Sequence, residues 1–148
     1  MRISVKGRYA LAAIIDIADE SISGNNVSVN SIAAKLGISK IYLEQVFSQL
    51  KKADLLTSVK GPKGGYQLAK SPSQITAWDV LSTLEFTLTE KPEDTVGDKA
   101  PVIETVLHAY IFEPLDEIVR KQLSAITVRD LLEFVKTQTA ESSFMLNM

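Results

Sequence analysis

The stretch SVNSIAAKLGISKIYLEQVFSQLKKADLL, residues 28–56, has the spacing of two short helices that meet at a glycine. Ser28 and Ser39 each stand where a helix can begin, because their hydroxyls can accept a hydrogen bond from a free backbone N–H. Gly37 can end the first helix, since glycine readily adopts the left-handed conformation found at many helix ends. Two helices around a turn of about three residues are typical of a helix-turn-helix unit. The stretch therefore predicts such a unit, with its second helix as the recognition helix.

A glycine-rich segment follows directly, in the stretch LLTSVKGPKGGYQLAK at residues 55–70. Two short runs, residues 55–59 and 66–68, can form strands on either side of Gly, Pro and Lys residues. Glycine allows positive φ and proline fixes φ, so these residues predict the turn of a β-hairpin. A helix-turn-helix followed by such a hairpin is the winged-helix arrangement, in which the recognition helix enters the major groove of DNA. We therefore expect the hairpin to be the wing, with glycines that let backbone N–H groups approach phosphates.

The remaining elements of a winged helix-turn-helix domain can be placed on either side of this stretch. Apolar residues at three- and four-residue steps between residues 4 and 20 predict a first helix, which Ser4 can cap. The stretch SPSQITAWDVLSTLE, residues 71–85, predicts another short helix that begins after Thr76. The sequence thus predicts a mainly α-helical chain with one small β-hairpin, and a winged helix-turn-helix domain over residues 1–86.

The second half of the chain has a different composition. Residues 87–100, TLTEKPEDTVGDKA, predict an acidic loop whose carboxylates lack the spacing of a calcium-binding loop. Further along, apolar pairs recur about every four residues and predict a long helix, which Pro114 should kink or interrupt. Thr127 and Asp130 can form a capping box for another helix. Residues 101–148 are therefore expected to form a dimerisation helix and a C-terminal helix.

The apolar stripe of the long helix outruns a small winged domain, since some 23 residues at 1.5 Å each span about 34 Å. A stripe of this length needs a partner, and an antiparallel or crossing copy of the same chain is the economical one. The alternative is that the helix folds back on its own domain. The candidate dimerisation residues are Val106, Leu107, Tyr110, Ile111, Leu115, Ile118 and Val119.

Charge and composition limit the function classes. The net charge of −2 combines +5 for residues 1–70, with ten Lys/Arg and five Asp/Glu, and −7 for residues 71–148, with six and thirteen. This asymmetry suggests that only the first half meets a polyanion such as DNA. The chain has no cysteine, which excludes disulfides, thiolate catalysis and cysteine-ligated metal sites. No apolar run is long enough to span a bilayer and the start lacks a secretory signal, so we expect no membrane partner and a cytoplasmic protein.

Three stretches resemble the Rrf-type winged-helix regulators, the family that includes the IscR, NsrR and CymR repressors. They are MRISVKGRYAL, GISKIYLEQVFSQLKKADLLTSVKGPKGGYQLA and ITAWDVLSTLE, all within the first 85 residues. The later stretch ITVRDLLEFV also resembles the family's last core helix. The resemblance implies a homodimeric bacterial DNA-binding protein. Its long helix would cross its twin and place two wings and two recognition helices on a palindromic site of double-stranded DNA.

The resemblance also implies which residues contact DNA. In the recognition helix these are Ser39, Ile41, Tyr42, Glu44 and Gln45. In the wing they are Lys60, Pro62, Gly64, Gly65 and Tyr66, and near the start they are Arg2, Ser4, Lys6 and Arg8. Two further candidates come from the residues themselves. Lys40 is expected on the exposed helix face, and Lys63 is expected to add a phosphate contact that releases counterions, as Lys60 does.

Base reading is expected near the start of the recognition helix. Glu44 can accept a hydrogen bond from a cytosine amino group and Gln45 can pair with adenine, whereas the simpler alternative is a solvated helix face. Two positions depart from the family pattern, because Ile41 is polar in cluster-type members and Lys60 replaces an arginine common in the wing. Since lysine does not reproduce the bidentate contacts of arginine, the preferred DNA sequence can differ from that of the relatives.

The sensing part of the family pattern is missing. Cluster-binding relatives carry three cysteines in the segment that matches residues 90–105, and this chain has none. His108 lies near the position where some relatives place a histidine ligand, but a lone imidazole cannot hold an iron–sulfur cluster without thiolates. The alternative is that His108 simply packs or lies exposed on the long helix. We therefore expect a cluster-free member with no cofactor and no metal, closer to the CymR type and controlled by a protein partner or a small molecule.

These observations favour a homodimeric, sequence-specific transcriptional regulator that represses by occupying a promoter. The acidic second half and the apolar tail motivate an alternative, an adaptor of the same fold that acts mainly through a partner enzyme. An enzymatic function is not expected. The chain has one histidine and no cysteine, and it lacks a phosphate-binding loop and paired carboxylates at a recognisable spacing.

Overall fold

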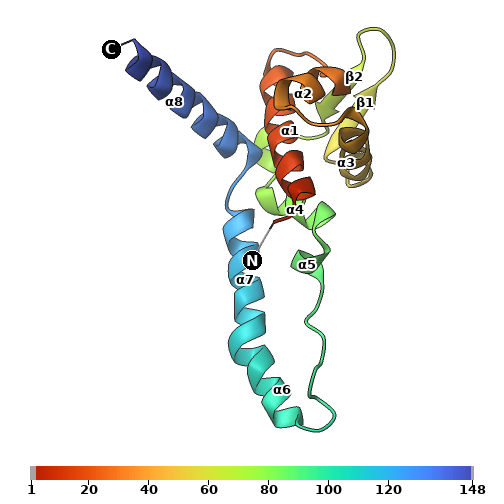
Figure 1. Ribbon diagram of the computed structural model, residues 1–148, viewed down its shortest axis with the longest axis vertical. Helices are drawn as coiled ribbons and strands as arrows, with labels where there is room; N and C mark the ends of the chain where they lie inside the picture. The colour runs from red at the N-terminus through yellow and green to blue at the C-terminus, as the bar shows by residue number, and fades with distance from the viewer. Residues whose placement is uncertain (1–2, 148) are drawn as a thin grey trace.

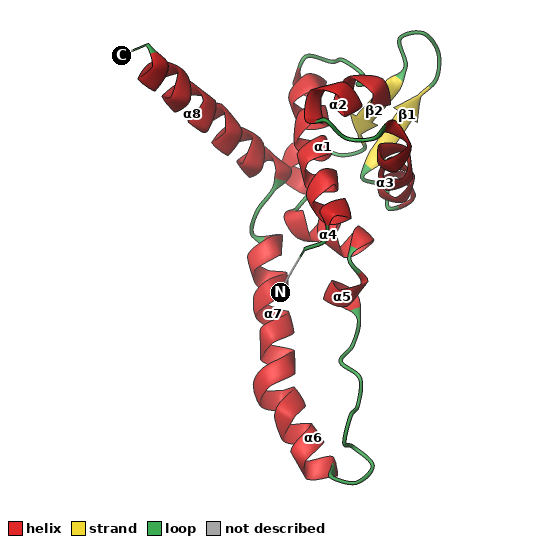
Figure 2. Ribbon diagram, viewed as in Figure 1, coloured by secondary structure: helices red, strands yellow, loops and turns green. Residues whose placement is uncertain are grey.

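The computed structural model describes residues 3–147, so Arg2, one of the candidate DNA contacts, lies outside the described residues. A small helical body carries one β-hairpin, and two helical arms project from it (Figure 1). The elements are α1 (Val5–Ile22), α2 (Val29–Leu36), α3 (Lys40–Lys52), β1 (Leu56–Val59), β2 (Gly65–Leu68), α4 (Ala77–Leu84), α5 (Phe86–Thr89), α6 (Pro101–Leu107), α7 (Glu113–Ser124) and α8 (Val128–Leu146). Figure 2 shows that helices dominate the described chain, which confirms the predicted mainly α-helical fold with one hairpin.

The predicted helix-turn-helix forms as α2 and α3. The Ser28 hydroxyl accepts a hydrogen bond from the Ser31 N–H at 3.1 Å, and Gly37 ends α2 with φ of 67°. The Ser39 hydroxyl accepts from the Tyr42 N–H at 3.4 Å at the start of α3. Local capping therefore decides where both helices begin and where the first one ends.

The core of the body lies between α1, α2, α3, the hairpin, α4 and the start of α8. It is entirely aliphatic except for Phe47, and its members come from one face of each amphipathic helix. The largest fully buried side chains include Ile14, Ile17, Ile32, Leu43, Phe47, Leu50, Leu56, Ile75, Val80 and Val128. Lys35 of α2 also forms an ion pair with the buried carboxylate of Asp16 in α1, so α1 and α2 are joined by a charged contact as well as by apolar packing.

The hairpin confirms the predicted strands within one residue. The strands β1 and β2 are antiparallel, with Leu56 opposite Leu68 and Val59 opposite Gly65. A further bridge joins Tyr66 to Val27, in the segment between α1 and α2. Through that bridge the hairpin is joined to the segment between α1 and α2.

The long helix of the second half forms in two parts. Between α6 and α7 the backbone makes a π-helical turn over residues His108–Phe112, and Pro114 follows in the first turn of α7. Proline has no N–H to donate to the carbonyl four residues earlier, so the wider turn takes up the break. This confirms the predicted interruption. We call α6, the π-helical turn and α7 together the rod, residues 101–124; it extends away from the body in Figure 1.

The two remaining segments differ in how they meet the body. The acidic loop, residues 87–100, runs beside the rod. Its first residues were expected to be loop, but in the structure they belong to the single helical turn α5. The turn forms because the Glu90 N–H bonds to the Phe86 carbonyl at 2.9 Å. Helix α8 docks through Val128 and Leu132 and then projects outward with its tail exposed. None of the helices among the described residues is long and apolar enough to cross a membrane.

Candidate nucleic-acid interface

The outer face of α3, which we call the recognition face, presents the predicted base-reading residues. Ile41 is 70% exposed, and Lys40, Glu44 and Gln45 are also exposed. Lys40 and Glu44 lie 4.0 Å apart across one helical turn, so the base-reading candidate Glu44 begins with a weak ionic partner on its own helix. Within two helical turns this face offers the ammonium donor of Lys40, the carboxylate acceptor of Glu44 and the side-chain amide of Gln45. Together these groups can distinguish base edges.

Tyr42 and Ser39 have structural partners at the start of α3. The Tyr42 ring packs edge-on against Tyr9 of α1, with 5.6 Å between centroids, and is half-buried. The Ser39 hydroxyl faces the Tyr42 N–H as the helix cap. Tyr42 therefore fixes the recognition helix against α1, and Ser39 caps the start of that helix.

The tip of the wing divides into projecting and anchored residues. Lys60, Pro62 and Lys63 are exposed at the end of the hairpin. Gly65 has φ of 150°, and a Cβ atom added there would lie 2.5 Å from the Val27 carbonyl oxygen. Only glycine fits that close approach, so this glycine serves packing between the hairpin and the body.

The two neighbours of Gly65 are held in a similar way. A Cβ atom at Gly64 would lie 2.1 Å from the Val59 carbonyl oxygen, inside the turn itself. The Tyr66 ring packs on Phe47 of the core, with 4.8 Å between centroids. The wing therefore has a rigid base, and its lysines extend from that base toward solvent.

Asn26 is an anchor of the wing that the sequence did not single out. Its side-chain N–H₂ donates to the Lys63 carbonyl at 3.0 Å, and its side-chain oxygen accepts from the Gln67 amide. One amide thus spans the hairpin from the segment SGNN, whose composition indicates only a loop. The pairing needs the bridge between Val27 and Tyr66, so no local signal in the sequence could have revealed it.

The N-terminal segment is fastened to the end of α4. The backbone N–H of Ser4 donates to the Glu85 carboxylate at 2.8 Å, and the Ser4 hydroxyl donates to the same oxygen. Glu85 is 8% exposed and lies so close to Gly7 that a Cβ atom there would come within 2.5 Å of it. Arg8 is exposed on the next turn, whereas Lys6 is half-buried. Glu85 therefore positions the basic N-terminal segment, a role that the sequence analysis missed.

The recognition face and the wing lie next to each other and away from the rod (Figure 1). Lys51 near the end of α3 donates to the Ser58 hydroxyl of β1 at 2.6 Å, which joins the two elements directly. The structure thus brings together the exposed candidates of α3 and the two wing lysines on one side of the body. The N-terminal segment approaches them through Tyr9, which touches Tyr42.

The candidate dimerisation residues lie along the rod. Tyr110 is 79% exposed, and Val106, Ile111, Leu115 and Ile118 are also exposed. Leu107 and Val119 are half-buried. The rod does not fold back over its own domain, so most of this apolar surface faces solvent in the single chain.

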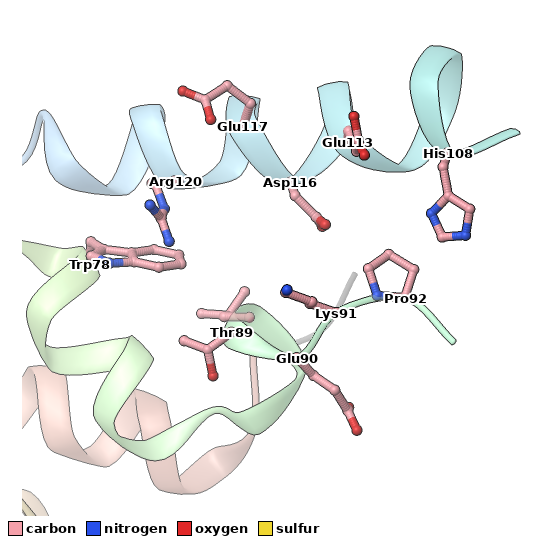
Figure 3. Close-up of a pocket in the computed structure, with 11 residues that line it drawn as sticks. Trp78, Thr89, Glu90, Lys91, Pro92, His108, Glu113, Asp116, Glu117 and Arg120 are labelled. Carbon is pink, nitrogen blue, oxygen red and sulfur yellow. The ribbon is translucent and has the colours of Figure 1, made fainter. Parts of the chain in front are cut away.

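A cavity of about 510 Å³ lies between the rod, the end of α5 and the acidic loop. Figure 3 shows Arg120 of α7 above the indole ring of Trp78, and the guanidinium carbon lies 5.0 Å from the ring centroid. Asp116 and Glu117 line the same cavity from α7. An aromatic platform and charges of both signs can bind a small polar molecule.

Glu104 is the most buried acid of the second half. It is 5% exposed and accepts hydrogen bonds from the backbone N–H groups of Val96 and Thr95, at 3.0 and 3.1 Å. The Val96 N–H and then the Thr95 N–H hold the pKa of this carboxyl below its ordinary value. His108 lies beside it, with Nε2 at 3.0 Å from a carboxylate oxygen. The acidic loop is therefore bound to α6 by an ionised carboxylate.

Comparison with known proteins agrees with the motifs. The family model described as Rrf2, iron-dependent transcriptional regulator, matches residues 3–134. The HTH-type transcriptional regulator ORF2 of Azotobacter vinelandii is 35% identical over 133 residues, covering 89% of this chain and 79% of that protein. IscR of Cronobacter sakazakii is 47% identical over 85 residues, 57% of this chain and 52% of IscR. The solved structure of CymR, the global cysteine regulator of B. subtilis, matches with a TM-score of 0.72 and 32% identity, covering 90% of this chain and 98% of that one.

Proposed function

Because the chain belongs to the Rrf2 family of DNA-binding transcriptional regulators, which are not enzymes, we propose that it is a homodimeric repressor without an iron–sulfur cluster. In this proposal two copies bind one palindromic site and block a promoter. The observation that best supports this proposal is that one chain has two separate exposed surfaces, one suited to DNA and one suited to a second copy of the chain. The recognition face and wing lysines are exposed on the body, and an exposed apolar surface lies on the rod.

The DNA-facing part of the proposal rests on the contacts around α3 and the wing. The exposed residues Lys40, Glu44 and Gln45 would face base edges, and Lys60 and Lys63 would face phosphates. The anchored residues Gly64, Gly65 and Tyr66 would bring the wing backbone to the duplex at a fixed height. The remaining candidate contacts are Ser4, Lys6, Arg8, Ser39, Ile41, Tyr42 and Pro62, together with Arg2, which lies outside the described residues.

The dimer part rests on the rod. Tyr110, Ile111 and Ile118 lie exposed on a helix that extends from the body, and a lone chain would leave them in water. Burying apolar surface contributes about 25 cal/mol per Å², so a second rod crossing the first is a favourable cover. A palindromic site matches this symmetry, because two-fold related recognition helices read identical half-sites.

The cluster-free part rests on the donor set. The family description names iron, and iron–sulfur clusters are held mainly by cysteine thiolates. The chain has no cysteine, and the groups near His108 are carboxylates. These residues do not fit an iron–sulfur cluster. Control by a small molecule is supported by the cavity beside Trp78 and Arg120, and control by a protein partner is the alternative.

A selection of bound duplexes from a random pool, followed by binding titrations of the selected site, tests this function. We expect a palindromic motif, two chains per duplex by light scattering, and affinity that falls steeply with salt. Placing the site over a promoter in a reporter strain should lower transcription. An enriched motif without two-fold symmetry, or one chain per duplex, would contradict the dimer; a rise in transcription would contradict repression.

One observation favours a second candidate function, the adaptor that acts through a partner enzyme. The tail residues Phe144, Met145 and Leu146 are all more than two-thirds exposed at the end of α8. Such a tail can bind an apolar groove of another protein. Truncation after residue 140 distinguishes the candidates, because a repressor keeps its DNA affinity and an adaptor loses capture of its partner.

A further inference from the structure

Three side chains with metal-binding atoms meet where the acidic loop lies against the rod. They are Asp94 of the loop, Glu104 of α6 and His108 of the π-helical turn, and one ligand atom of each lies within 4.8 Å of the other two. His108 Nε2 is 3.0 Å from Glu104 Oε1 and 3.4 Å from Asp94 Oδ1. We propose that these three side chains form a binding site for a single divalent transition-metal ion.

The distances between the three ligand atoms fit such an ion. Imidazole nitrogen and carboxylate oxygen bind zinc and similar ions at about 2.0–2.2 Å. Two ligands at about 2.1 Å from one ion are separated by about 3.0 Å in octahedral geometry and about 3.4 Å in tetrahedral geometry. The separation from His108 Nε2 to Glu104 is 3.0 Å, which is the octahedral spacing, and the separation to the exposed Asp94 is 3.4 Å, so Asp94 would shift slightly to complete that geometry. The third pair of ligand atoms lies within 4.8 Å. An ion can therefore be bound with little rearrangement of the side chains.

The ligand atoms of the cluster are all acceptors unless His108 Nε2 carries a proton. Carboxylate oxygens only accept, and an unprotonated imidazole nitrogen also only accepts. His108 Nε2 faces oxygens of both Asp94 and Glu104, so a proton or a metal cation must lie between them. A proton on Nε2 is shared between two oxygens, whereas a metal ion is bound by all three atoms at once.

The charge around the cluster favours a cation. The adjoining cavity, of about 460 Å³, is lined by Asp98 and Glu113 in addition to the three cluster residues, and its lining within residues 3–147 includes no lysine or arginine. Lys91 and Arg120 line the neighbouring cavity on the other side of His108. Among the described residues, neither Asp94 nor Glu104 forms an ion pair with a lysine or arginine. The negative charge is thus left for an exogenous cation to balance.

Glu104 is already oriented for binding. Its carboxylate is held by the N–H groups of Thr95 and Val96, and the Thr95 hydroxyl donates to Oε2 at 3.2 Å. Groups that orient a ligand in this way commonly raise the metal affinity of a site, because the ligand does not have to be ordered on binding. Asp94 is exposed at the rim, with 79% of its side chain accessible, and gives an ion a route of entry.

The donor set selects the class of ion. One imidazole and two carboxylates suit Mn²⁺, Fe²⁺, Co²⁺ or Zn²⁺, whereas Ca²⁺ and Mg²⁺ prefer oxygen ligands alone. The site needs neither thiolate nor sulfide and so differs in chemistry from an iron–sulfur cluster. A bound ion would join the acidic loop to the rod. The site does not depend on the proposed function, since binding can be measured without DNA.

Titration of the full-length, chelator-treated protein with Co²⁺ tests the site, because the visible absorption of Co²⁺ reports its coordination. We expect one ion per chain, displacement by Zn²⁺ and weak competition from Mg²⁺ or Ca²⁺. The variants Asp94→Asn and His108→Gln should each lower the affinity at least about tenfold. The matched control Asp98→Asn removes an acid that lines the same cavity but supplies no ligand atom to the cluster, so it should lower the affinity far less than Asp94→Asn does.

Thermal unfolding provides a second measurement that guards against misfolded variants. Zn²⁺ should raise the Tm of the parent and of Asp98→Asn, because a ligand that binds only the folded state stabilises it. The same addition should raise the Tm of Asp94→Asn clearly less, because a weaker site stabilises the folded state less at the same Zn²⁺ concentration. Absence of saturable binding would overturn the proposal. Equal weakening by Asp94→Asn and Asp98→Asn, or equal competition from Mg²⁺, would also overturn it, because either result indicates a diffuse acidic surface.

Discussion

The body and the rod use similar apolar residues in opposite environments. In the body, Ile14, Ile17 and Ile32 are fully buried between packed helices. In the rod, Ile111 and Ile118 are at least half exposed and Tyr110 is more so. The same amphipathic periodicity therefore produces a closed core where neighbouring helices follow closely in sequence, and an open surface where a helix extends alone. The charges differ in the same way, with +5 before residue 71 and −7 after it.

This difference teaches that the two regions depend on different partners. The body needs no second chain, because its helices and hairpin bury one another's apolar faces and its helix ends are capped by its own side chains. The rod has an apolar surface that is largely exposed, and the acidic loop lies against it at Glu104. Variants in the two regions should therefore fail in different ways, and the following predictions separate them.

The largest effect is expected from Ile118→Glu in the rod. Ile118 is 64% exposed, so the body should fold normally, but a buried charge at the proposed interface costs several kcal/mol. We expect monomers in light scattering and a fall in affinity for a palindromic duplex of at least about a hundredfold, which corresponds to about 2.7 kcal/mol.

Glu117→Gln is the matched control, because Glu117 lines the cavity on another side of α7. It should remain dimeric and bind DNA as the parent does. A dimeric Ile118→Glu protein would show that the rod is not the interface.

The next effect concerns the base of the wing. In Gly65→Ala the added methyl would meet the Val27 carbonyl at 2.5 Å and also strain a residue with φ of 150°. Such strain costs about 1–3 kcal/mol, measured as a lower free energy of unfolding in urea.

Gly61→Ala is the control, since Gly61 also has positive φ, of 106°, but a Cβ there meets nothing within 4 Å. It should destabilise the protein less than Gly65→Ala does. Equal losses would indicate that backbone strain alone matters and that the contact with Val27 is unimportant.

A smaller effect is expected from Lys60→Ala combined with Lys63→Ala at the wing tip. Both lysines are exposed, so stability should not change, but affinity for every DNA sequence should fall by about tenfold. The slope of log K against log salt should become shallower by about 0.9 for each lost phosphate contact. Lys99→Ala combined with Lys136→Ala, two exposed lysines of the second half, is the charge-matched control. An unchanged slope in the double variant would show that Lys60 and Lys63 do not contact phosphates.

The smallest effect is the pH dependence of the contact between the acidic loop and α6. The pKa of Glu104 is lowered by the Val96 and Thr95 N–H groups, so its contribution to stability is present above its ordinary pKa of 4.5. The contribution is lost as pH falls below 4.5 through the lowered pKa. Hydrogen exchange of the Val96 N–H should report this loss, and Glu104→Gln should remove the pH dependence. Persistent dependence in that variant would assign it to another group.

Much of the fold could be predicted because its signals are local. Ser28, Gly37 and Ser39 mark helix ends within a few residues, and turn residues fix the hairpin. The interruption at Pro114 follows from a missing N–H. By contrast, no local pattern indicated that Asn26 and Glu85 are anchors. Their partners lie about 40 and 80 residues away, and such pairings have no periodicity.

The meeting of Asp94, Glu104 and His108 is another feature that local reasoning did not find. The sequence analysis expected no metal, because the chain has no cysteine and the carboxylates of residues 87–100 lack the spacing of a calcium-binding loop. Glu104 and His108 lie one helical turn apart, which is a local signal, but Asp94 reaches them only because the acidic loop folds back along α6. Loop geometry of this kind depends on the whole path of the chain.

The sequence by itself determined the helix-turn-helix, the hairpin, the interrupted long helix and the family, because capping, turn chemistry and apolar periodicity act over a few residues. Only the tertiary structure decided which wing residues project and which are anchored, and how Ser4 is bound to Glu85. It also decided that Asp94 meets Glu104 and His108. The physical reason is that these contacts join segments distant in sequence, and their geometry exists only after the core has packed.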